Sequence, residues 1–138
     1  LSEVGLVKAQ RLADEKGVTF HTRIADVATM EMKPNNYAVV TMVFCHFIEP
    51  VRTAVMQKIV RSLQPGGMFA AVFYHPNQIA FATGGPSDPA MLGTLEEMQV
   101  AINGLEWQVA EHCEHELHEG VRHKGMSSVI YLLGRKPL

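Results

Sequence analysis

Apolar residues in the middle of this chain follow two spacings, one typical of strands and one typical of helices. Tyr37–Phe44 and Met68–Tyr74 are almost wholly apolar and rich in β-formers, as expected for strands that are covered on both faces. Between them, apolar residues recur at helical spacing and form one stripe: Val51, Val55, Ile59 and Leu63. Strand, helix and strand in this order predict one βαβ unit of a parallel sheet.

The segments on either side carry local signals for further elements. Ser2 is a candidate N-cap and Gly17 a candidate C-cap, which together predict a first helix. Val18–Ile24 alternates imperfectly between apolar and polar residues and predicts a strand. Downstream, Pro76–Gly93 contains three prolines and three glycines and predicts a long irregular loop.

The last third of the chain predicts a short helix followed by two strands. Thr94 with Glu97 is a capping-box signature for a helix that ends near Gly104. Trp107–Leu117 and Met126–Leu133 then fit an antiparallel pair of strands. We therefore predict a single α/β domain over residues 1–138, with a Rossmann-like, mostly parallel sheet, helices on both faces and an antiparallel C-terminal edge strand.

Composition narrows the class of protein. Hydrophobic residues make up 47% of the 138 residues and charged residues 19%, which is typical of a globular domain. The formal net charge is −2 without a Lys/Arg cluster, so we expect no nucleic-acid partner. No apolar run approaches the roughly 20 residues of a membrane helix, so we expect no membrane partner. Two cysteines without a disulfide pattern favour a cytoplasmic location.

Polar and aromatic residues follow each of the two central strands. Ligands of parallel sheets bind at the carboxyl ends of the strands, so these residues are candidates for a site. His46 is a candidate catalytic base, with a histidine that merely caps the strand end as the alternative. Tyr74, His75 and Asn77 are candidates for a substrate pocket. Cys45 is better explained as a small buried residue.

Two motifs in this order resemble class I S-adenosylmethionine-dependent methyltransferases. Ala25-Asp26-Val27 closes the predicted early strand, and Leu63-Gln64-Pro65-Gly66-Gly67 precedes the second central strand. The resemblance implies that Asp26 and the backbone of Val27 contact the adenine of S-adenosylmethionine. It also implies that Val43 and Phe44 meet the methionine part of that cofactor. A helix N-cap or a turn former is the alternative for Asp26.

The downstream half resembles the tellurite-resistance and thiopurine-type methyltransferases. The motifs are Gly84-Gly85-Pro86, Met91-Leu92, Glu119-Gly120-x-x-His123-x-Gly125 and Arg135-Lys136-Pro137. This resemblance implies a small-molecule methyl acceptor and a place for His123 near it. A hairpin-stabilising histidine is the alternative for His123.

The sequence departs from the family because it holds neither the Gly-x-Gly-x-Gly loop nor the acidic strand end that binds the ribose. We therefore expect an N-terminally truncated member with an open sheet edge, which a second copy would cover in a homodimer. A non-catalytic Rossmann-like binding or assembly module that has lost cofactor binding is the alternative. A nicotinamide dehydrogenase is disfavoured because no Gly-x-Gly-x-x-Gly follows a strand.

The residue types of a histidine-rich segment near the C-terminus suit zinc. Residues 112–118 read His-Cys-Glu-His-Glu-Leu-His. Alternation along a strand places His112 and Glu114 on one face, and Cys113 and His115 on the other, which gives no compact ligand set. We expect a solvated strand face and no metal.

Overall fold

The computed structural model describes residues 2–120 and 123–138, which form two compact units, one up to residue 31 and one from residue 32 onward. The first unit contains helix α1, Glu3–Lys16. As predicted, Ser2 caps its start, where the Oγ atom accepts the Gly5 N–H at 3.1 Å. Gly17 ends the helix with φ of 65°, a left-handed conformation that glycine adopts without a Cβ clash.

The strand predicted at Val18–Ile24 is wrong, since these residues have no regular secondary structure. Val18, Phe20 and Ile24 expose much of their side chains. A strand is held by backbone hydrogen bonds to a neighbouring strand, and the described residues of the first unit contain no second strand. Apolar alternation alone therefore did not fix the conformation of this segment.

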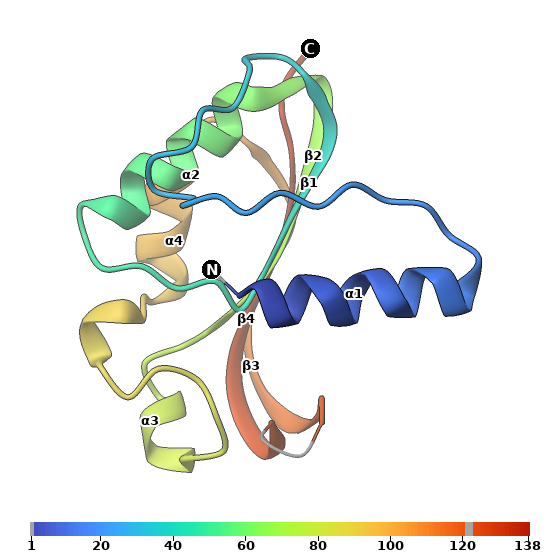
Figure 1. Cartoon of the computed structure of the whole chain (residues 1–138). Helices are drawn as coiled ribbons and strands as arrows, with labels where there is room; N and C mark the ends of the chain where they lie inside the picture. Colours follow the sequence, from blue (N-terminus) through green and yellow to red (C-terminus); the bar gives the residue numbers. More distant parts are fainter. Residues whose placement is uncertain (1, 121–122) are drawn as a thin grey trace. The chain divides into compact units, whose positions relative to one another are not determined.

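The second unit is built on a four-stranded mixed sheet (Figure 1). Its strand order is β1-β2-β4-β3, with bounds Tyr37–Val43 for β1, Leu63–Tyr74 for β2, Glu106–His118 for β3 and Lys124–Arg135 for β4. Strands β1 and β2 are parallel and are joined by helix α2, Val51–Ser62, which confirms the βαβ unit. Strand β4 is antiparallel to both β2 and β3. The predicted α/β class is confirmed, with parallel pairing in the described sheet limited to β1 and β2.

Helix α2 and helix α4, Leu95–Ala101, cover the same face of this sheet (Figure 1). Val55 and Ile59 of the predicted apolar stripe are buried there together with Met56. Phe69 and Phe73 project from β2 into the same core and are almost fully buried. Burial of a side chain of this size contributes roughly 2–3 kcal/mol, so this layer supplies much of the stability.

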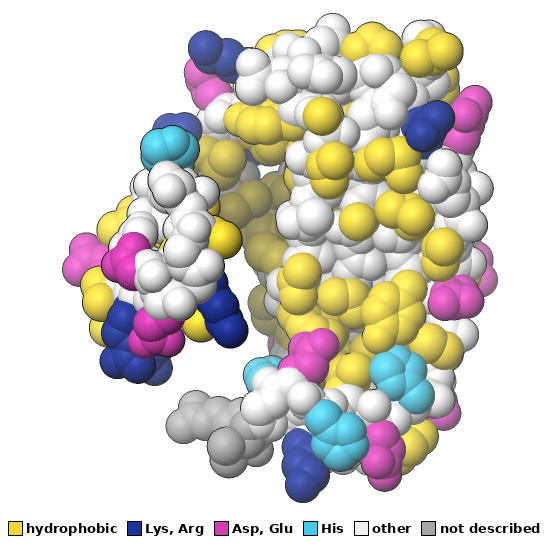
Figure 2. Space-filling view, turned by 90° about the vertical axis from the view of Figure 1, so that its right-hand side faces the viewer, with side chains coloured by type: hydrophobic (Ala, Val, Ile, Leu, Met, Phe, Trp, Pro, Cys, Tyr) yellow, Lys and Arg dark blue, Asp and Glu magenta, His cyan; other side chains and the backbone are white. Residues whose placement is uncertain are grey.

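Within the second unit, Figure 2 shows hydrophobic side chains spread across the other face of the sheet. An open hollow of about 350 Å³ lies over its centre, where small side chains of β2 meet larger ones of β3 and β4. Its lining includes Ala70, Val72, Val109, Tyr131 and Leu133. Strand β1 forms one edge of the described sheet and exposes Val39. The homodimer expected at this edge stays a prediction.

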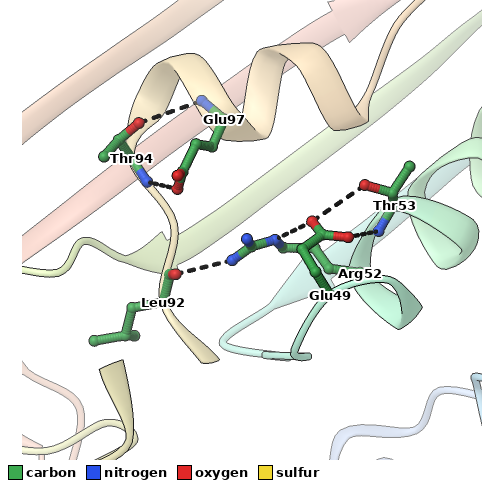
Figure 3. Close-up of polar contacts among 6 residues, drawn as sticks. All are labelled: Glu49, Arg52, Thr53, Leu92, Thr94 and Glu97. Carbon is green, nitrogen blue, oxygen red and sulfur yellow. Dashed lines mark hydrogen bonds and ion pairs between the residues drawn. The ribbon is translucent and has the colours of Figure 1, made fainter. Parts of the chain in front are cut away.

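The segment between β2 and β3 is more ordered than the predicted loop. It contains the short helix α3, Gln78–Phe81, and a 3₁₀ turn, Pro89–Met91. The capping box of α4 is confirmed: Thr94 Oγ1 accepts the Glu97 N–H at 3.3 Å, and the Glu97 carboxylate accepts the Thr94 N–H at 2.9 Å (Figure 3). In the connection between β3 and β4, Val121 and Arg122 lie outside the described residues. Across the described chain, each helix is too short or too polar to cross a bilayer.

Candidate functional site at the strand ends

Four aromatic side chains meet at the carboxyl ends of β1 and β2, and we call Phe44, His46, Tyr74 and His123 the strand-end cluster. The ring of Tyr74 stacks on Phe44 with centroids 4.4 Å apart, and it also stacks on His46 and His123 at 5.8 and 6.5 Å. The Phe44 N–H donates to the Val72 carbonyl, which extends the parallel pairing to this point. The structure thus brings together residues that the sequence predicted on three separate segments.

Phe44 has a φ of 47°, which is uncommon for a residue with a side chain. The positive φ ends β1 and turns the chain just before His46. Such strained positions occur often at functional sites, where the surrounding structure holds them in place. Val43, the other predicted contact for the methionine part of the cofactor, is exposed at the end of β1. Its cofactor contact stays a prediction.

Tyr74 is the centre of the cluster and is only 1% exposed. Its phenol oxygen lies 3.2 Å from Nδ1 of His123, which belongs to the connection between β3 and β4. Burial, followed by the negative charge of Glu119, raises the pKa of Tyr74. The phenol therefore stays protonated at neutral pH and can donate to His123. A substrate role for Tyr74 stays a prediction. Its burial favours a positioning role, in which the ring packs against the other side chains of the cluster.

His46 is held as a neutral imidazole. Its Nε2 atom is buried and lacks a hydrogen-bond partner among the described residues. The ring borders a cavity of about 10 Å³, with room for about one water molecule. Burial, followed by the positive charge of Arg52, lowers the pKa of His46 to about 4. Such a group is a weak base at pH 7, so the predicted catalytic role of His46 stays a prediction.

We expect His46 to make the protein less stable in acid. The unfolded chain binds a proton at this imidazole near pH 6.5, whereas the folded chain does so only near pH 4. Stability is therefore lost as the pH falls from about 6.5 to about 4. At pH 5 the loss is about 1 kcal/mol, after allowance for partial solvent access.

Urea unfolding at pH 7.5 and pH 5, followed by the fluorescence of Trp107, measures this loss. The variant His46→Gln is expected to lose less stability between the two pH values than the wild type. His21→Gln, which changes an exposed histidine, is the matched control and should behave like the wild type. Equal pH dependence in His46→Gln and the wild type would contradict the assignment.

Arg52 is a residue of this region that the sequence analysis missed. Its side chain belongs to the first turn of α2, is buried, and lines the same small cavity as His46 and Tyr74. Its Nε donates to the Glu49 carboxylate and its Nη1 to the Leu92 carbonyl, both at 2.8 Å (Figure 3). Glu49 also accepts from the Thr53 hydroxyl at 3.1 Å. Local sequence gives no signal for this role because Leu92 lies 40 residues away.

Gln78 is a second missed residue, and its side chain is 1% exposed. Its Oε1 accepts the Ser128 N–H at 2.8 Å. Its Nε2 donates to the Thr83 hydroxyl and the Gly84 carbonyl at 3.0 and 3.1 Å. The amide thereby fixes the loop after β2 to strand β4, next to Tyr74.

The side chain of His75 contacts strand β3 and does not belong to the strand-end cluster. Its ring stacks on that of His112 with centroids 3.8 Å apart. On the other face of β3, Nε2 of His115 lies 3.0 Å from the Tyr131 hydroxyl, so the predicted alternation of this strand is confirmed. No three His, Cys, Asp or Glu side chains are grouped to hold a metal ion in the described part of the chain.

Burial raises the pKa of Cys45, in keeping with a structural thiol.

Asp26 and Val27 lie in the first unit, in a turn that follows the irregular segment. The Asp26 carboxylate accepts the Ala28 N–H at 2.9 Å, and its carbonyl accepts the Met30 N–H at 2.7 Å. Asp26 therefore forms a turn, which is one of the two alternatives considered for it in the sequence. Its side chain is exposed and accessible to a ligand. The adenine contact stays a prediction.

Comparison with known proteins supports the methyltransferase resemblance. Residues 1–67, slightly less than half of the chain, match the family model described as "Methyltransferase domain". No match was found among curated proteins.

Solved structures share the fold. One has a TM-score of 0.74 at 12% identity and is described as "Conversion of a Disulfide Bond into a Thioacetal Group during Echinomycin Biosynthesis". The alignment includes 99% of this chain and 64% of that chain. TehB from Haemophilus influenzae has a TM-score of 0.73 at 13% identity, with 98% of this chain covering 47% of that protein.

A third structure is an S-adenosylmethionine-dependent methyltransferase from Methanosarcina mazei, with a TM-score of 0.71 at 13% identity. There, 99% of this chain covers 79% of the other chain. At such identities the likeness establishes the fold, and the chain spans less than two thirds of the length of the first two structures. The solved structures thus establish the fold, and the match of residues 1–67 is the comparison that points to methyltransferases.

Proposed function

We propose that this chain is part of an S-adenosylmethionine-dependent methyltransferase that acts on a small-molecule acceptor. The observation that supports this most strongly is the match of residues 1–67 to a methyltransferase domain. The strand-end cluster adds support, because it lies at the carboxyl ends of parallel strands, where ligands of such sheets bind. When bound, S-adenosylmethionine supplies a methyl group already activated by its sulfonium.

The residues present fit such a cofactor in two respects. Asp26 offers an exposed carboxylate, an acceptor suited to the amino group of adenine. Val43 and Phe44 offer apolar surface where β1 ends, suited to the aliphatic part of methionine. In this proposal the protein mainly positions the two reactants, because an activated methyl group needs no covalent enzyme intermediate.

A non-catalytic binding module is a second candidate, favoured by one observation. The imidazole Nε2 of His46 is buried against a cavity of about 10 Å³, which is too small for an acceptor molecule. Thermal unfolding with S-adenosylhomocysteine separates the two candidates. A methyltransferase is expected to show a rise in Tm at millimolar ligand, and an unchanged Tm would favour the module.

If the chain binds S-adenosylhomocysteine, Asp26→Ala is expected to weaken binding about tenfold, because it removes a hydrogen bond to the adenine amino group. Isothermal titration calorimetry measures the Kd. The matched control is Asp88→Ala, since Asp88 accepts the Ala90 N–H at 2.9 Å, in the same local pattern as Asp26 with Ala28. Equal Kd values for the two variants would contradict the adenine contact and leave the cofactor class untouched.

A further inference from the structure

The stacked histidines His75 and His112 join three strands at a single point. His75 directly follows β2, His112 lies in β3, and Ser128 of β4 lies between them. The His75 N–H donates to the Ser128 carbonyl at 3.0 Å, and Nε2 of His112 lies 2.7 Å from the Ser128 hydroxyl. Ser128 is fully buried, whereas His75 is half-buried and His112 is exposed, so water reaches the pair from the side of His112.

The geometry of His75 requires a neutral ring. Its Nδ1 accepts the backbone N–H of Asn77 at 3.2 Å, which is only possible while Nδ1 carries no proton. Protonation of this ring therefore removes the acceptor of that hydrogen bond. It also places a positive charge against the ring of His112, whose centroid is 3.8 Å away at an interplanar angle of 15°.

Charged groups around the pair act in opposite directions. Glu96 and Glu97 of α4 and Glu114 of β3 favour a positive charge on His75, and the Asn77 side chain donates to Glu114 at 3.3 Å. Burial, which is the largest effect, and His112 oppose it. The net result is that the pKa of His75 lies below its usual value, so the neutral ring seen here is the form at pH 7.

We propose that the His75–His112 pair is an acid-sensitive contact, and that protonation of His75 releases residues 75–77 from strands β3 and β4. The released segment leads directly into Gln78, whose amide holds the Ser128 N–H and the Gly84 carbonyl. Release therefore loosens the loop that follows Gln78 and packs on Tyr74. Acid thus acts on the strand-end cluster indirectly, through residues 75–77 and this loop.

Amide hydrogen exchange measured by NMR at pH 7.5 and pH 5, corrected for intrinsic rates, tests the proposal on the whole chain. Protection of the His75 and Asn77 amides is expected to fall about tenfold more than that of the Phe69 amide, which reports the core of β2. In His75→Phe, which keeps a flat ring but cannot be protonated, the extra loss at residue 75 should vanish. His118→Gln changes an exposed histidine of β3, the strand that contains His112, and should behave like the wild type.

Two results would overturn the proposal. The first is that, in the wild type, the protection of the His75 and Asn77 amides falls no more between pH 7.5 and pH 5 than that of the Phe69 amide. The second is an undiminished extra loss at residue 75 in His75→Phe. Titration of the His75 ring in the wild type adds a test that needs no variant: its midpoint must coincide with the loss of protection, and a separate midpoint contradicts the mechanism. His112→Gln should raise the pKa of His75, because it removes the group that opposes the charge.

Discussion

Replacing Arg52 by methionine is expected to lower the free energy of unfolding by about 3 kcal/mol, because a buried hydrogen-bonding network loses its central donor. The substitution leaves the Leu92 carbonyl without the N–H that it accepts at 2.8 Å. It also leaves Glu49 without its cation, although that carboxylate is half exposed. The space is tight as well: a Cβ atom on Gly93 would lie 2.8 Å from Nη1 of Arg52.

Urea unfolding of Arg52→Met at pH 7.5 measures this loss. Arg11→Met is the matched control, because Arg11 makes a similar contact to Glu15 at 3.1 Å but is 82% exposed. The control should show no measurable loss, since exposed ion pairs contribute little. A second readout is the pKa of His46: burial, the larger cause, keeps it low, but it should rise in Arg52→Met because the additional effect of the positive charge is gone. Similar stability losses in both variants would contradict a structural role for Arg52.

Replacing Gly85 by alanine is expected to destabilise the protein by about 3 kcal/mol, through backbone strain and a steric clash. Gly85 has a φ of 86°, which disfavours any side chain. An added Cβ atom would lie 2.7 Å from Cδ2 of Tyr74. That ring cannot move away without breaking its stack on Phe44 and its hydrogen bond to His123.

Gly104→Ala separates the two contributions. Gly104 has a similar φ of 98°, but an added Cβ atom would lie 3.7 Å from Val60, an ordinary contact distance. This control should lose only the backbone part, about 1 kcal/mol. The difference between the two variants therefore measures the clash with Tyr74. Equal losses in Gly85→Ala and Gly104→Ala would show that the Tyr74 ring adapts freely.

The elements that the sequence predicted correctly depend on local signals. Ser2 and Thr94 cap helices through bonds to residues three positions away, so the motif and the contact coincide in the chain. The βαβ unit was predictable because its two strands are apolar throughout and the helix between them has one apolar stripe. Val18–Ile24 failed because the bonds that make a strand come from another segment, and alternation does not reveal whether that segment is present.

The candidate site was predictable only in part, for the same reason. Strand ends pointed to His46 and Tyr74, and a family resemblance pointed to His123; the contact between Tyr74 and His123 joins residues 49 positions apart. In the sequence, Arg52 lies in the predicted helix between the two central strands and Gln78 lies in the predicted irregular loop, and neither stands out. Their burial follows from partners 40 and 50 residues away, which no pattern in the sequence identifies.

The position of β4 in the sheet has a consequence for how the chain is made. This strand follows β2 and β3 in the sequence, yet it lies between them. Neither of the earlier strands can complete its hydrogen bonding on that side until residues 124–135 have left the ribosome. We therefore expect the facing edges of β2 and β3 to stay without hydrogen-bond partners until β4 emerges, an interval in which chaperones can bind the nascent polypeptide.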